Sequence, residues 1–145
     1  MEKMTEIQIG TFNIDIINMS IEVALRNKLL ENVNLKDIID ERMYLLKLPQ
    51  NPVYPAVVYF KVSNPRHHII GVAYPRFQFS VFAKTYKEAK KVADLIRFVI
   101  QREKGITGGI PIIQGVYLNE IDLYENDTQL YHIACDYKII YKGGG

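Results

Sequence analysis

Alternation of apolar and polar positions predicts most of the strands of this chain. The clearest case is RFQFSVFA (76–83), in which one face carries Phe77, Phe79, Val81 and Ala83. Residues 55–63 are rich in Val, Tyr and Phe, which favours a second strand. Three more strands are expected at 42–50, 112–124 and 130–141. The polar link ENDTQ (125–129) between the last two is typical of a hairpin loop.

Helical spacing of apolar positions predicts two helices. In residues 20–31, Ser20 is a suitable N-cap and the apolar residues that follow recur every four positions. Leu35 to Ile39 can add one more turn. The second helix is expected from about Tyr86 to Lys104, after a capping box that runs from Thr85 to Glu88.

The order of these elements indicates an α+β fold. Successive hairpins imply a single, mainly antiparallel sheet of four to five strands, with the long amphipathic helix and the shorter N-terminal helix packed on one face. We expect one domain over residues 20–142, preceded by an extended arm (1–18) and followed by a flexible tail (143–145). Residues 64–74 lack periodicity and predict a loop or a hairpin arm.

Composition narrows the function. The chain has 145 residues and a net charge of +2, so it lacks the basic excess typical of nucleic-acid-binding proteins. It contains no apolar run long enough for a membrane helix, and its start does not resemble a signal peptide. The single cysteine excludes an internal disulfide and fits a reducing compartment.

Possible catalytic or metal-binding residues are few. Adjacent His67 and His68 would point to opposite faces of a strand, so polar loop residues are the better interpretation. Cys135 and His132 are three positions apart in an expected strand, which puts them on opposite faces and argues against a nucleophile–base pair. Gly108-Gly109 lacks the Lys-Ser/Thr of a phosphate loop. We therefore expect no catalytic residue, metal or cofactor.

Charged and aromatic clusters have less specific interpretations. Glu120, Asp122, Glu125 and Asp127 lack the pattern of a calcium loop and predict a solvated turn, or else a charged contact with a partner. The basic residues between 84 and 104 are expected on a solvated helix face, with subunit or nucleic-acid contact as alternatives. The tyrosines and phenylalanines of the strands belong either to the core or to an outer interaction face.

Three segments together resemble a known family. They are LKLPQNPVYPAVVYFKVS, RFQFSVFAKTYKEAKKVADLIRFVI and GVYLNEIDLYENDTQLYHIACDYKIIY. Their order is similar to that of the tail completion proteins of tailed phages and prophages, which join heads to tails. The similarity rests on Leu48-Pro49, Pro55 to Tyr59, Phe77 to Tyr86 and Asp122 to Tyr131. It spans about residues 20–142, and the N-terminal 18 residues extend beyond the family pattern.

The resemblance implies a non-enzymatic virion protein. Such proteins form a ring, typically a hexamer, that joins the tail tube to the head connector or stopper. They assemble in the host cytoplasm and reside at the head–tail junction, with neither membrane nor specific nucleic acid as a partner. Residues 64–74 would then become ordered on assembly, and Arg66, His67, His68, Tyr124 and Asp127 are the expected protein-contact residues.

Two other functions stay open on the sequence alone. An aromatic sheet surface can stack on single-stranded nucleic acid, which would have to compensate for the low net charge. A small enzyme is disfavoured because none of the pairs considered above has a catalytic arrangement.

Overall fold

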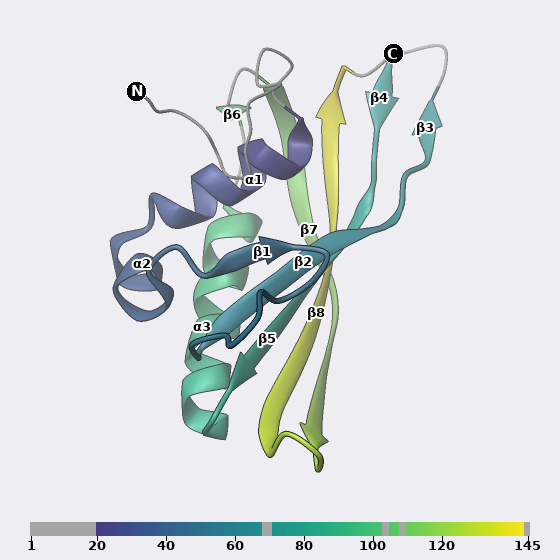
Figure 1. Cartoon of the computed structure of the whole chain (residues 1–145). Helices are drawn as coiled ribbons and strands as arrows, with labels where there is room; N and C mark the ends of the chain where they lie inside the picture. The colour runs from purple at the N-terminus through teal and green to yellow at the C-terminus, as the bar shows by residue number, and fades with distance from the viewer. Residues whose placement is uncertain (1–19, 68–70, 103–104, 108–109, 144–145) are drawn as a thin grey trace.

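Three helices cover one face of a curled, mixed β-sheet (Figure 1). The computed structural model describes residues 20–67, 71–102, 105–107 and 110–143. The helices are α1 (Ile21–Leu30), α2 (Val33–Ile39) and α3 (Tyr86–Gln101). The strands are β1 (Met43–Leu45), β2 (Ala56–Ser63), β3 (Arg66–His67), β4 (Val72–Ala73), β5 (Arg76–Ala83), β6 (Gly105–Thr107), β7 (Ile110–Glu125) and β8 (Leu130–Lys142).

Strand β8 lies in the middle of the sheet. It pairs with β5 and β4 along one side and with β7 along the other. Beyond β5 come β2 and then β1, and β6 adds to the start of β7. Only the β1–β2 pair is parallel among the described pairs. The sheet therefore has β1 at one long edge and β7 at the other.

The core lies between the sheet and α3. This helix buries its apolar stripe, which consists of Ala89, Val92, Ala93, Ile96 and Ile100. Aromatic rings from three neighbouring strands meet the helices: Tyr59 stacks on Phe79 at 5.6 Å between ring centroids, and Phe79 meets the edge of Tyr137 at 5.9 Å. All three rings are buried and belong to the core.

The expected α+β class and one-sided helix packing are confirmed. Both helix starts are confirmed as well: the Ser20 hydroxyl accepts the Val23 N–H at 3.2 Å, and the Thr85 hydroxyl accepts the Glu88 N–H at 3.2 Å. The N-terminal arm lies outside the described residues. The expected arm at 64–74 contains the short β3–β4 hairpin, in which Arg66 pairs with Ala73.

Two boundaries and one additional strand differ from the expectations. Helix α3 ends at Gln101 rather than Lys104, and the Arg102 N–H bonds back to the Val99 carbonyl. The strand expected at 42–50 stops at Leu45, because Leu46 takes a positive φ of 74° and turns the chain away. Strand β6 was not expected, since its three residues carry no alternating pattern.

Candidate interaction surface

Strand β7 has an outer edge that is open among the described residues. Strand β6 covers that edge only as far as Ile112, and no other strand of the described chain pairs with it from there to Glu125. Unpaired N–H and C=O groups of such an edge can accept a strand or loop of another chain. Four aliphatic side chains of this stretch are 40–49% exposed: Ile113, Leu118, Ile121 and Leu123.

The sheet face away from the helices carries an apolar strip near the β7–β8 turn. Leu123 pairs with His132, which pairs in turn with Phe82 of β5. Because paired residues share a face, these three side chains form a row across three strands. The His132 ring stacks on Phe82 with centroids 4.3 Å apart, and Ile121 lies beside Ala134 in the next row.

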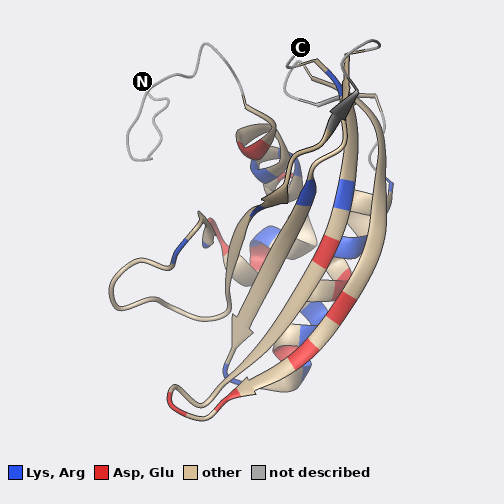
Figure 2. Ribbon diagram, turned by 90° about the vertical axis from the view of Figure 1, so that its right-hand side faces the viewer, with Lys and Arg blue, Asp and Glu red and all other residues tan. Residues whose placement is uncertain are grey.

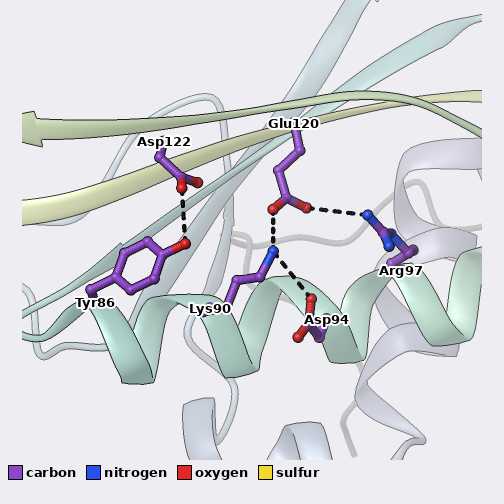
Figure 3. A network of polar contacts seen from close by, with 6 residues as sticks. All are labelled: Tyr86, Lys90, Asp94, Arg97, Glu120 and Asp122. Atoms are coloured by element: carbon purple, nitrogen blue, oxygen red, sulfur yellow. Dashed lines mark hydrogen bonds and ion pairs between the residues drawn. The ribbon is translucent and has the colours of Figure 1, made fainter.

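On the other face, polar contacts fasten β7 to α3 (Figure 3). The Glu120 carboxylate accepts a 2.6 Å hydrogen bond from the Lys90 ammonium and lies 3.8 Å from the Arg97 guanidinium. Nearby, the Tyr86 hydroxyl donates to Asp122 at 2.8 Å. The hydrogen bond to Glu120 raises the pKa of Lys90, and the bond to Asp122 raises the pKa of Tyr86. These contacts hold the open strand at a fixed position on the helix.

A glycine brings the start of β7 close to the end of α3. A Cβ atom on Gly115 would lie 2.3 Å from the Ile100 carbonyl oxygen and 2.8 Å from Ile100 Cγ2. Only glycine fits such a close approach of strand and helix backbones. Two register shifts in β7, at 112–114 and 117–119, lie on either side of this site.

The opposite sheet edge carries a projecting loop. Residues 46–55 join β1 to β2 and extend away from the sheet on the side opposite β7 (Figure 2). Leu46 and Val53 in this loop are 69% and 61% exposed. Both side chains are therefore accessible to another molecule.

The five expected contact residues fall into two separate groups. Tyr124 is 48% exposed near the end of β7, where its ring packs on Tyr131 at 4.9 Å, and Asp127 is exposed in the turn that follows. Arg66 and His67 form β3, at the other end of the sheet (Figure 1). His68 lies outside the described residues. These groups do not form one site.

The acidic cluster is not simply a solvated turn. Asp122 and Asp127 are exposed as expected, but the Glu120 side chain is only 9% exposed because it points at α3. Lys90 likewise departs from the expected solvated helix face. Sequence spacing could not reveal this contact, because the two residues are thirty positions apart.

Cys135 and His132 lie on opposite faces of the sheet. Cys135 lies on the helix-covered face, while His132 lies on the other. Burial raises the pKa of the Cys135 thiol to about 12 and lowers the pKa of His132. Within the described residues, no group of three His, Cys, Asp or Glu side chains is placed to hold a metal ion.

These features define a small α+β protein whose accessible features are an open strand edge and exposed apolar side chains. No described helix is long and apolar enough to cross a membrane. The sequence did not single out the exposed apolar residues of the two edges, because an exposed Leu or Val cannot be distinguished from a buried one by residue type.

Comparison with known proteins identifies the family. The family "Tail completion protein gp17" matches residues 23–142, and the chain belongs to it. The resemblance noted in the sequence is thereby confirmed. Within this family the chain is a structural component of a phage-type virion.

A solved structure has the same fold. A chain from "Virion of native gene transfer agent (GTA) particle" superimposes with a TM-score of 0.71, at 12% sequence identity, over 90% of this chain and 100% of that chain. At this identity the likeness establishes the fold. No curated protein matches the sequence.

Proposed function

We propose that this chain completes the tail of a phage or prophage particle as a ring, expected to be a hexamer, that joins the tail tube to the head connector or stopper. Membership of the tail completion family over residues 23–142 is the observation that carries the proposal. Assembly would take place in the host cytoplasm, and the protein would remain at the head–tail junction of the virion.

The surface features support a structural rather than an enzymatic role. A joining protein needs contact surfaces, and the chain exposes apolar side chains at both sheet edges. An enzyme needs a nucleophile, base or metal in a cleft. The one thiol of the chain is buried with a raised pKa, and His132 lies on the other side of the sheet.

Burial of the central rings argues against the alternative of nucleic-acid binding through sheet aromatics. Tyr59, Phe77, Phe79 and Tyr137 are at most 2% exposed and lie under the helices. Buried rings cannot stack on bases. Phe82 faces away from the helices, but His132 already stacks on it.

A genetic experiment tests the proposal. The gene is inactivated in the phage or prophage that encodes it, and lysates are viewed by electron microscopy. We expect filled heads and separate tails, and purified protein added to the lysate should restore joined particles. Intact joined particles without the protein would refute the joining role.

A further inference from the structure

We propose that copies of this protein associate head to tail, with the open β7 edge of one copy against the β1 edge and its 46–55 loop on the next copy. The proposal deepens the proposed function, because it rests on the ring and names the contact that would build it. A ring needs two different surfaces on each subunit, since one self-complementary surface gives only closed pairs. The sheet order puts these two features at opposite edges.

The charges of the two edges are opposite in sign. The segment that forms the β1 edge, residues 42–63, contains Arg42, Lys47 and Lys61, and neither Asp nor Glu. The segment that forms the β7 edge, residues 105–129, contains Glu120, Asp122, Glu125 and Asp127, and neither Lys nor Arg. Figure 2 shows the acidic positions along β7 and its turn, away from the projecting loop.

Contacts within the chain neutralise one charge on each side. Lys61 pairs with Glu22 at 3.0 Å, and Glu120 pairs with Lys90 at 2.6 Å. That leaves two basic residues in the first segment and three acidic residues in the second. Opposite charges on two surfaces steer the surfaces together during association and fix their relative orientation.

The same charges oppose the alternative pairings. Two β7 edges placed side by side would bring together two sets of three carboxylates, and two β1 edges would bring together two pairs of cations. Like charges across an interface are strongly unfavourable. Only the unlike edges attract, so a second copy in head-to-tail orientation is the occupant that the structure favours.

The apolar side chains supply the desolvated part of the contact. Leu46 and Val53 project from the loop, and Ile121 and Leu123 line the opposite edge. Burying such side chains between copies is the main driving force of association, while the charges around them select the partner. The polar contacts between β7 and α3 keep the accepting edge in place before the partner arrives.

Two complementary variants test the orientation. The edge variant carries Ile121→Asp and Leu123→Asp, and the loop variant carries Leu46→Asp and Val53→Asp. Each removes one of the two surfaces, and all four residues are at least 46% exposed, so both variants should fold. Native mass spectrometry should find each variant monomeric alone. Their mixture should give a 1:1 dimer that does not grow, because only one intact pair of surfaces meets.

Cysteine crosslinking covers the case in which the contact is weak without the tail. Val53→Cys and Ile121→Cys proteins are mixed at high concentration under mild oxidation. The native Cys135 is buried and should not interfere. The matched control replaces Ile121→Cys by Lys87→Cys, which lies on an exposed position of α3. We expect at least tenfold more heterodimer than in the control.

The outcomes are decisive in both directions. A 1:1 dimer in the mixture, or a crosslink above the control, supports the head-to-tail contact. If both variants assemble as the wild type does, or if the mixture stays monomeric and the crosslink does not exceed the control, the proposal is overturned. Joining of heads and tails in the complementation experiment would still be possible through another surface, so the two proposals can fail separately.

Discussion

Replacing Gly115 by alanine should be strongly destabilising, because β7 meets the end of α3 at this residue. The added Cβ would lie 2.3 Å from the Ile100 carbonyl oxygen. Favourable contacts between heavy atoms begin at about 3.5 Å, so strand and helix would have to separate by roughly 1 Å. The obstacle is a backbone atom, which cannot move aside as the end of a flexible side chain can.

The size of the effect follows from that shift. Inserting a group into a packed site typically costs about 1–3 kcal/mol, and a backbone obstacle puts Gly115→Ala near the upper end of this range. At an m-value of about 2 kcal/mol per molar urea, a loss of about 3 kcal/mol lowers the unfolding midpoint by roughly 1.5 M.

Equilibrium urea unfolding, followed by circular dichroism, measures this midpoint. Val116→Ala is a suitable control, since it also changes one residue of β7 but does not add an atom. A drop of less than about 0.5 kcal/mol for Gly115→Ala, within the range of ordinary surface substitutions, would refute the close approach of β7 and α3.

Three further predictions concern side chains near β7 and β8. Lys90→Met should lower the free energy of unfolding by about 1–3 kcal/mol, because it leaves the nearly buried Glu120 carboxylate without its closest cation. In the same urea titration, the control Lys87→Met should change the free energy of unfolding by less than about 0.5 kcal/mol. The pKa of His132 is lower in the folded protein than its unfolded value of 6.5, so the unfolded chain takes up the proton first. Its contribution to stability is therefore present above pH 6.5 and is lost as the pH falls, and the stability of wild type minus that of His132→Phe should decrease from pH 7.5 to 5.5; a constant difference would contradict this. The Cys135 thiol should resist a thiol reagent at pH 8 until urea unfolds the protein, because burial raises its pKa to about 12, and rapid labelling of the native protein would contradict its placement.

Much of the fold could be predicted because its central strands alternate regularly. Strand β5 buries Phe77, Phe79, Val81 and Ala83 on the helix side, as the pattern indicated. The capping signals at Ser20 and Thr85 were reliable for a related reason, since a cap depends on residues only three positions apart. Rules based on sequence spacing predict an element correctly when contacts between residues close in sequence determine it.

The remaining features depend on contacts between distant residues. The apolar run at 42–50 looks like one strand, but β2 supports only its first part, and the chain turns at Leu46. The role of Glu120 depends on Lys90 of α3, and no spacing rule connects these positions. The exposed loop and strand edge could not be found by sequence, because exposure is a property of the assembled sheet.

Strand β7 shows how an open strand edge can be selective for one partner instead of pairing with any other strand. Long, regular and apolar edges tend to pair with any other strand, and bulges or charges normally prevent this. Two register shifts interrupt β7, and its carboxylates repel another acidic edge. The exposed Ile121 and Leu123 nevertheless remain available. An edge with these properties disfavours pairing with a copy of itself, and the basic segment around the 46–55 loop of a neighbouring copy is the surface that we propose it accepts.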